Sequence, residues 1–431
     1  MRVEWVVAFP PVAPRADHPV TYVTDVEGQW ARLHSFLDDN PHASLQGGSL
    51  VVAPGATLVF GGDAIDRGPH GRRIVRLLLE AKRRQPDQLV LLAGNRDINK
   101  LRLATELCGA PLRFVPEELL HAPRAELLRW IFAHTMGASQ AFEHRQEELR
   151  ALGLSADDDD VVQSFLDDLA PAGELTEYLS ACQLGWRAGH TLYVHGGLAD
   201  EALCVVPGHE PVPLARFDLE VWMERLNAFY AEQLQAFVAR ARRADGRPEW
   251  REVVRYQMPR PGTRVNPGSV VYGRFGDADN NPTLPPSSVM AALTRSGVHR
   301  VIVGHTPIGD IASVVRTAGF ELIIADNSRS RVATACRLTV RDDAVELLGK
   351  VVLDDQRERL VRATLPLADL ESPVGRRTAD GSLVKAPLDE GFHTFRYLPG
   401  FQMTQRVVAA DALGPLQEAP APALDDDGSI G

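Results

Sequence analysis

The chain lacks the features that mark a membrane protein or a disulfide-stapled one. No stretch of its 431 residues approaches the ~20 consecutive apolar residues that a membrane helix needs. Its four cysteines are far apart and include no CxxC pair, so they predict neither a disulfide framework nor a zinc ribbon. We expect buried free thiols at Cys108, Cys182, Cys204 and Cys336.

Positive charge is also scarce. The chain has 57 acidic and 46 basic residues, and its formal charge of −11 disfavours binding to a polyphosphate backbone. Nucleic acid is therefore not an expected partner. The N-terminal apolar run is short and interrupted by prolines, unlike a signal peptide. With 45% hydrophobic and 24% charged residues, the chain can bury a large core, and we expect a cytoplasmic globular protein.

Short apolar runs that end in a polar residue recur along the chain, with helical patterns between them, and this alternation predicts an α/β fold. In open α/β sheets, ligands bind where strands deliver their carboxyl ends, so we expect these polar side chains to converge on one crevice. The predicted strands are 20–24 before Asp25, 57–60 before Asp63, 89–93 before Asn95, 191–194 before His195, 300–303 before His305 and 321–325 before Asp326.

Two long segments interrupt this rhythm. Residues 100–185, which include the acidic run 157–160, and residues 215–258 have helical spacing and predict helical insertions. After Asp326, the segments 334–340 and 344–353 alternate like the two strands of a closing hairpin. Proline, glycine and acidic residues accumulate beyond residue 365, so we expect a main domain over 1–365 and a partly irregular C-terminal extension over 366–431, with a frayed end.

The most specific motif is Gly62-Asp63-Ala64-Ile65-Asp66-Arg67-Gly68, which follows an apolar strand. A carboxylate at a strand end can bridge two cations, and a nearby arginine can hold phosphate in its planar fork. The alternative interpretation is a strand-to-helix turn with a surface ion pair. Asn95, His195 and His305 each follow an apolar strand and precede small or turn residues. Histidines in this position favour ligation when the chain already supplies aspartate and asparagine at strand ends.

Together these motifs resemble those of the calcineurin-like metallophosphoesterases, in the correct order over about residues 20–345, and are closest to the phosphoprotein phosphatase and dinucleoside tetraphosphatase branch. The resemblance implies an αββα sandwich of two mixed sheets flanked by helices. It implies that Asp25 and Asp63 bind a first metal, and that Asp63 bridges to a second metal completed by Asn95, His195 and His305. Arg67 would hold substrate phosphate, and Arg274 matches a second phosphate-binding arginine.

The implied activity is hydrolysis of phosphoesters or phosphoanhydrides by a metal-bridging water. The substrate would be a phosphorylated small molecule, a nucleotide or a phosphoprotein. The cofactor would be two divalent ions, because paired cations activate water and stabilise both the attacking and the leaving oxygen. Oxygen and imidazole ligands without thiolate suit manganese, iron, zinc or magnesium.

Two residues depart from the family pattern. Glu27 stands where the family has a histidine ligand, and as a harder ligand it favours manganese, iron or magnesium over zinc; alternatively, it only forms hydrogen bonds near the site. Arg96 replaces the histidine that assists the leaving group, and arginine is a very poor proton donor. Asp66 is then free to pair with Arg96. Activated leaving groups, such as those of anhydrides or aryl phosphates, are therefore the expected substrates.

Arg96, Lys100 and Arg102 form a basic cluster compatible with a polyanionic substrate, or else a helix start with solvated charges. Two alternative functions follow from the departures. One is a metal-binding pseudophosphatase that recognises phosphorylated partners, and the other is non-hydrolytic chemistry at iron. The sequence does not specify an oligomeric state.

Overall fold

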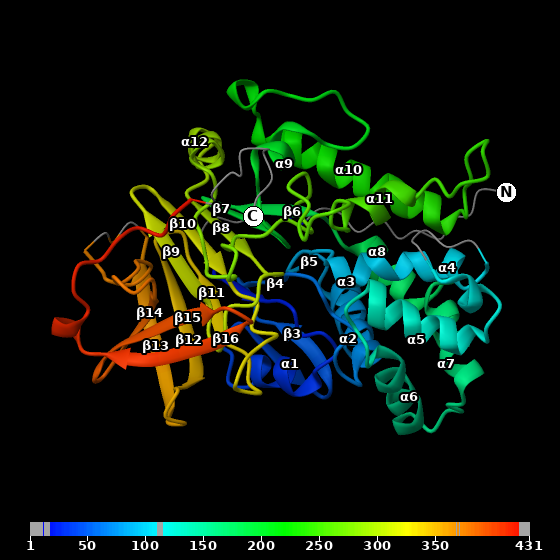
Figure 1. Cartoon of the computed structure of the whole chain (residues 1–431), viewed down its shortest axis with the longest axis horizontal. Coiled ribbons are helices and arrows are strands. Elements are labelled where there is room, and N and C mark those ends of the chain that lie inside the picture. The colour runs from blue at the N-terminus through cyan, green and yellow to red at the C-terminus, as the bar shows by residue number, and fades with distance from the viewer. Residues whose placement is uncertain (1–11, 13–17, 110–114, 368, 370, 422–431) are drawn as a thin grey trace.

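The computed structural model describes residues 12, 18–109, 115–367, 369 and 371–421. The predicted strands are all present, and they form two mixed sheets that pack face to face (Figure 1). The N-terminal apolar run and the acidic C-terminal end lie outside the described residues.

The larger sheet has six strands in the spatial order β13 (Glu358–Pro366), β12 (Ala344–Val352), β11 (Arg337–Val340), β1 (Val20–Val23), β4 (Thr57–Phe60) and β5 (Leu89–Leu91). Strands β1, β4 and β5 run parallel, whereas β11 to β13 are antiparallel. The predicted closing hairpin is therefore confirmed as β11 and β12.

The second sheet has five strands in the order β6 (Gly185–Ala188), β7 (Thr191–Val194), β8 (Arg300–Val303), β10 (Phe320–Ile324) and β9 (Ser313–Thr317). Its three central strands are parallel and its edge strands are antiparallel. The remaining strands are the hairpin of β2 (Ala43–Gln46) and β3 (Ser49–Val52), and a small antiparallel sheet of β14 (Leu383–Leu388), β15 (Gly391–Leu398) and β16 (Gln402–Val408).

Alternation along the strands builds two apolar layers. Tyr22, Val59, Tyr193 and Ile302 point between the two sheets, and the rings of Tyr22 and Tyr193 stack with centroids 6.0 Å apart. Neighbouring positions on the same strands point outward, as Phe60 does, and belong to the cluster that includes the buried faces of the helices. Successive side chains of a strand face opposite ways, which is why strands with helices on one side and a second sheet on the other are apolar throughout.

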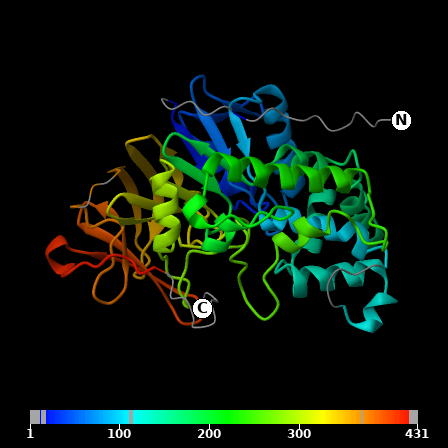
Figure 2. The ribbon, with the colours of Figure 1, turned by 90° about the horizontal axis from the view of Figure 1, so that it is seen from above.

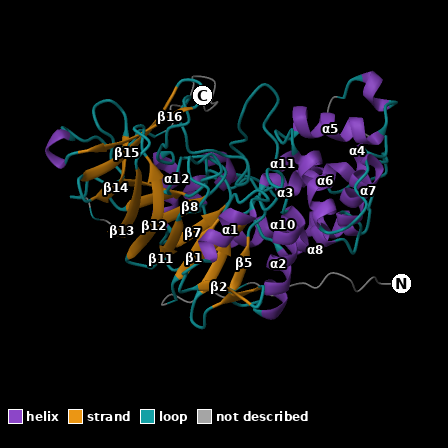
Figure 3. Ribbon diagram, turned by 90° about the horizontal axis from the view of Figure 1, so that it is seen from below, coloured by secondary structure: helices purple, strands orange, loops and turns teal. Residues whose placement is uncertain are grey.

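Most of the helices, including those of both predicted insertions, gather at the end of the molecule opposite β14 to β16 (Figures 2 and 3). The helices are α1 (Trp30–Leu37), α2 (Gly71–Arg84), α3 (Asn95–Ile98), α4 (Leu103–Glu106), α5 (Arg124–Thr135), α6 (Ala141–Ala151), α7 (Asp158–Asp168), α8 (Glu174–Ala181), α9 (Asp200–Cys204), α10 (Leu219–Val238), α11 (Arg251–Tyr256) and α12 (Ser287–Arg295). Both predicted insertions are thus largely helical. The acidic run starts α7, where the Asp157 side chain accepts a hydrogen bond from the Asp160 backbone N–H at 2.9 Å.

The described part of the chain has neither a membrane-spanning helix nor a disulfide. No helix in the described ranges is long and apolar enough to cross a membrane. All four cysteines are free; Cys182 and Cys336 are buried, Cys204 is half-buried and Cys108 is exposed. The expectation of burial was therefore wrong for Cys108, which follows α4 and is exposed, and it holds only in part for Cys204.

Candidate metal centre

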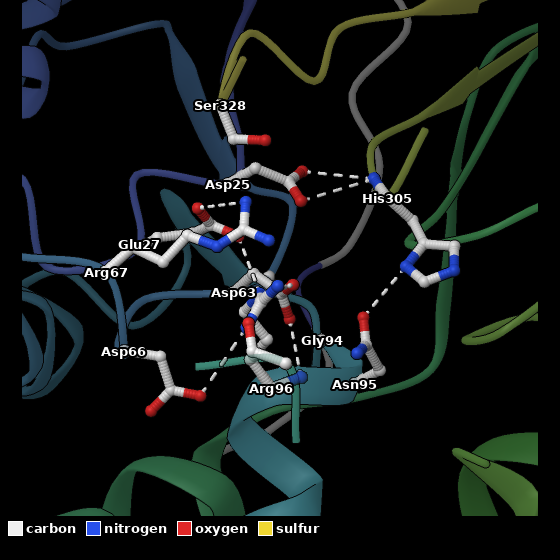
Figure 4. A network of polar contacts seen from close by, with 12 residues as sticks. Asp25, Glu27, Asp63, Asp66, Arg67, Gly94, Asn95, Arg96, His305 and Ser328 are labelled. Atoms are coloured by element: carbon white, nitrogen blue, oxygen red, sulfur yellow. Dashed lines mark hydrogen bonds and ion pairs between the residues drawn. The ribbon is translucent and has the colours of Figure 1, made fainter. Parts of the chain in front are cut away.

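The polar residues at the strand ends meet at one point, as predicted. Asp25 follows β1, Asp63 follows β4, Asn95 follows β5, His195 follows β7 and His305 follows β8. Figure 4 shows Asp25, Asp63, Asn95 and His305. Suitable ligand atoms of Asp25, Asp63 and His195 all lie within 4.8 Å of one another. Residues separated by up to 280 positions in the chain thus share one small volume, because parallel strands of two facing sheets end at the same edge.

Asn95 connects the two histidines. Its Oδ1 lies 2.8 Å from Nδ1 of His305 and 3.2 Å from Nε2 of His195. The same Nε2 lies 3.5 Å from Oδ1 of Asp63. One aspartate oxygen, one amide oxygen and two imidazole nitrogens therefore face a common point.

The hydrogen bonding of this group suits a cation. Nδ1 of His195 lies 2.8 Å from the Gly61 carbonyl oxygen, a contact it can make only as a donor, so the tautomer with its proton on Nδ1 has a lone pair on Nε2. That lone pair faces the oxygens of Asn95 and Asp63. Burial, followed by Arg274, lowers the pKa of His305 well below its ordinary value, and its Nε2 has no hydrogen-bond partner among the described residues. Facing acceptors of this kind fit a divalent metal ion, which neutral imidazole and carboxylate bind.

The backbone is strained at the same residues. Asp25, Glu27, Asp63, Asp66 and His305 adopt φ angles of 52°, 48°, 57°, 108° and 60°, in the left-handed region that side chains rarely occupy. Backbone hydrogen bonds hold the strained loops together. For example, the N–H of Glu27 donates to the backbone carbonyl oxygen of Asp63 at 2.9 Å. Such strain concentrates at functional sites, where the surrounding structure fixes it.

Two glycines of the motifs are required by close packing. A Cβ on Gly94 would collide with the carboxylate and backbone nitrogen of Asp63, and a Cβ on Gly304 would collide with the carboxylate of Asp25. The glycine before each ligand thus allows a neighbouring strand end to approach.

Glu27 lies at the edge of this cluster, buried and bound by two arginines (Figure 4). Its Oε1 lies 2.6 Å from Nε of Arg96, and its Oε2 accepts a hydrogen bond from Nη1 of Arg67 at 3.2 Å. Burial raises the pKa of Glu27 to about 7, and the two arginines oppose that shift.

Arg96 is surrounded by carboxylates. Its guanidinium lies 3.6 Å from Asp63 and 3.8 Å from Asp66, and its backbone N–H donates to Oδ1 of Asp63 at 2.8 Å. Although burial opposes the charge, Glu27, Asp63 and Asp66 raise the pKa of Arg96 above its ordinary value. Arg96 is therefore a fixed positive charge beside the candidate metal donors.

Asp66 has a closer partner than the predicted Arg96. Nζ of Lys100 lies 2.6 Å from Oδ2 of Asp66 and also donates to the Asn99 side chain and the Arg96 carbonyl oxygen. Lys100 is fully buried, and Arg102 is buried with both Nε and Nη2 on the carboxylate of Glu106, at 2.9 and 3.0 Å. The alternative of solvated charges at a helix start was therefore wrong for Lys100 and Arg102.

Sequence reasoning did not assign a role to Asp97. Its carboxylate accepts hydrogen bonds from the backbone N–H groups of Asp63, Ala64 and Gly94 at 2.9, 2.9 and 3.2 Å. Burial, followed by repulsion from Asp63, raises its pKa to about 8. Asp97 thus ties the loop after β4 to the loop after β5, and its place in the Asn95-Arg96-Asp97 motif was the available signal.

The comparisons with known proteins agree with this geometry. A family model for calcineurin-like phosphoesterases matches residues 18–309. The chain belongs to this family. The matched range includes all five candidate ligands at the strand ends, from Asp25 to His305.

Solved structures to which the chain is similar include phosphatases. A cold-active protein-tyrosine phosphatase of a psychrophilic Shewanella species is 17% identical over 82% of each chain, with a TM-score of 0.46. A serine/threonine phosphatase from Saccharomyces cerevisiae with similarity to human phosphatase PP5 is 12% identical over 82% of this chain and 84% of that one, with a TM-score of 0.38. A metallophosphoesterase from Sphaerobacter thermophilus is 13% identical over 81% and 89%, with a TM-score of 0.31. No curated protein matches the chain.

The candidate metal donors of this calcineurin-like phosphoesterase open into a cleft of about 380 Å³. Arg67, Arg96 and Arg274, the arginines predicted to bind substrate, all line it. Arg274 is brought there by its neighbour Gly273, whose carbonyl oxygen accepts from the N–H of Gly197 after β7 at 2.7 Å. Further lining residues that the sequence did not single out for this role come from both insertions, from the loop after β10 and from the C-terminal sheet, namely Thr135, Met136, Gly137, Gln257, Met258, Arg329 and Phe401. Asp326, at the end of β10, lines the cleft too.

Proposed function

We propose that the chain is a metal-dependent hydrolase of phosphoesters or phosphoanhydrides that prefers substrates with a good leaving group. The observation that carries the proposal is the meeting of five strand-end ligands beneath a cleft lined by Arg67, Arg96 and Arg274. A cluster of metal donors facing several guanidinium groups suits a phosphoryl group, whose oxygens arginine binds in its planar fork.

Two divalent cations would be held by Asp25, Glu27 and Asp63 on one side and by Asp63, Asn95, His195 and His305 on the other. Bound there, they would supply an activated water and stabilise charge at phosphorus. Glu27 can bind a cation while it holds Arg67 and Arg96, because a carboxylate has lone pairs beyond those that two hydrogen bonds use. Manganese or iron suits this oxygen-rich donor set best, with magnesium or zinc as further candidates.

Arg96 determines the preference among substrates. Its guanidinium stays protonated at every working pH, so it can stabilise the charge of a phosphoryl group but supplies no proton to the departing oxygen. Loss of a general acid costs about 10²- to 10⁴-fold when the leaving group needs a proton. The leaving groups of anhydrides and aryl phosphates depart without a proton, so these substrates would be cleaved faster than alkyl phosphates.

The test is an assay of the metal-free and metal-loaded protein on p-nitrophenyl phosphate, nucleoside triphosphate and glycerol phosphate with manganese, iron, magnesium or zinc. We expect turnover of the first two, loss of turnover with chelator, and no turnover for Asp63→Asn at unchanged far-ultraviolet circular dichroism. Faster cleavage of glycerol phosphate would contradict the leaving-group preference. Tight metal binding without turnover of any of these substrates would favour the pseudophosphatase, and an iron absorption band without hydrolysis would favour chemistry at iron.

A further inference from the structure

An aromatic side chain from the C-terminal sheet reaches the cleft. Phe401 lies in the turn between β15 and β16, nearly 100 residues beyond His305, yet it lines the same cleft as the metal donors. Its side chain is 39% exposed, and it is one of few large apolar residues with that exposure in the described chain. A solitary exposed phenylalanine needs no explanation, but one on the wall of a charged cleft is placed to contact a bound ligand.

The turn itself does not call for phenylalanine. Phe401 has a φ of 60°, directly after Gly400 at 79°, and glycine or asparagine fits such a left-handed position better. The bulky ring therefore occupies the turn against the local preference of the backbone. The strain lies next to the site, where an observed outlier supports a functional role.

Neighbouring side chains fix the direction of the ring. The Arg329 guanidinium lies over the Phe401 ring with its carbon 5.0 Å from the centroid. Tyr397 meets the ring edge-on with centroids 5.6 Å apart. Tyr397 is in turn held through its backbone by Asn281, with hydrogen bonds of 2.7 and 3.1 Å.

The whole small sheet is anchored beside the metal centre. Nζ of Lys385 on β14 donates to the carbonyl oxygens of Ile308 and Ile311 at 2.6 and 2.5 Å, in the loop that follows His305. The Gln405 side chain on β16 donates to Oδ2 of Asp310 in the same loop at 2.6 Å. Phe401 is therefore carried on a rigid element, as positioning groups of a binding site are.

From this geometry we propose that Phe401, backed by Arg329, forms a subsite for a planar aromatic group attached to the phosphate of the substrate. Arg67, Arg96 and Arg274 would take the phosphoryl oxygens, and the remainder of the substrate would lie along the Phe401 wall of the same cleft. Aromatic groups stack on such a ring, and the class includes both the ring of an aryl ester and the base of a nucleotide. The inference rests on the proposed phosphate-binding function and extends it to a preference for substrates that carry an aromatic ring.

Binding of non-hydrolysable phosphonates tests the subsite independently of turnover. By calorimetry on the manganese-loaded protein, we expect phenylphosphonate to bind about tenfold more tightly than methylphosphonate, as a ring-stacking contact would give. In Phe401→Ala the ratio should fall to about one, because only the phenyl compound loses its contact, whereas Phe401→Tyr should keep it. Thermal denaturation of Phe401→Asn, which suits the left-handed turn, distinguishes a lost contact from a misfolded sheet.

Substrate kinetics then separate the two sources of the ring. If the subsite takes an aryl ester, Phe401→Ala should raise the KM for p-nitrophenyl phosphate and leave its kcat unchanged. If the subsite takes a base, the same variant should raise the KM for a nucleoside triphosphate. The KM for glycerol phosphate, which has no ring, should not rise in either case. Equal binding of the two phosphonates to the wild-type protein would overturn the subsite and leave the proposed function standing. Failure of both phosphonates to bind, together with no turnover, would overturn both.

Discussion

Nε of Arg96 lies 2.6 Å from Oε1 of Glu27, inside the region where the first cation is proposed to bind. A guanidinium beside a cation repels it, so Arg96→Met should tighten manganese binding, by about tenfold for each 1.4 kcal/mol of repulsion removed. Turnover should fall by about 10²- to 10³-fold, because an electrostatic contact to the phosphoryl group is lost. Calorimetric titration and p-nitrophenyl phosphate kinetics measure the two effects.

The matched control for this variant is Arg96→Lys, which keeps the charge but not the planar fork. Its manganese affinity should stay close to that of the wild type while turnover falls. If Arg96→Met weakens manganese binding instead, Arg96 does not compete with a cation and the placement of the first metal is wrong.

Asn95 provides a second test, since its side chain joins the two histidines at 2.8 and 3.2 Å. Asn95→Ala should weaken manganese binding by about tenfold or more, because one amide ligand is lost from the cluster. Manganese should raise the melting temperature of the wild type through ligand linkage and raise that of Asn95→Ala less. Asn227→Ala, which changes an asparagine outside the cleft lining, is the control and should respond to manganese as the wild type does.

The buried pair of Lys100 and Asp66 predicts a stability effect independent of metal. Lys100→Met leaves the Asp66 carboxylate buried without its closest partner and should lower the free energy of unfolding by about 3–5 kcal/mol. The double variant Lys100→Met/Asp66→Asn should lose less than the two single changes together, because neither charge is then left alone. Urea denaturation measures both; strict additivity would show that the pair is not coupled.

Lys385 predicts a pH dependence of stability. Burial lowers the pKa of Lys385 to about 7, well below that of an unfolded lysine at about 10.4. Between these values the unfolded chain binds the extra proton, so the free energy of unfolding should rise with pH by about 1.4 kcal/mol per unit through this group. Below pH 7 both states are protonated and the contribution to the slope disappears.

The measurement is the difference in unfolding free energy between the wild type and Lys385→Met at several pH values from 6 to 10. We expect a flat difference below pH 7 and a growing advantage of the wild type above it. Lys350→Met removes an exposed lysine of β12 and should give a flat difference throughout. A flat curve for Lys385→Met as well would refute the assigned pKa.

The sequence was sufficient to predict the strand ends and the convergence of their side chains. Asp25, Asp63, Asn95, His195 and His305 were identifiable because each follows an apolar run, and parallel strands leave few ways to arrange their ends. The helical insertions and the hairpin of β11 and β12 were equally visible, since their periodicity is local.

Contacts between distant segments were not predictable in the same way. Lys100 looked as much like a solvated residue as a functional one, because lysine is rarely buried without a partner, and its partner Asp66 lies 34 positions away. Phe401 gave no signal at all. Its role depends on how β14 to β16 dock, and the hydrogen bond from Gln405 to Asp310 that fixes them spans 95 positions.

The anchoring of the loop behind His305 has a consequence for the newly made chain. A ribosome delivers every candidate metal donor before Lys385 and Gln405, so the loop at 308–311 lacks its hydrogen bonds from these two residues while β14 to β16 are still being synthesised. Until then, Asp310 in this loop can be held by the hydroxyl of Ser330 and by the backbone N–H groups of Arg331 and Val352. The hydrogen bonds between the small sheet and the loop behind His305 are therefore the last contacts of that loop to form as the chain is synthesised.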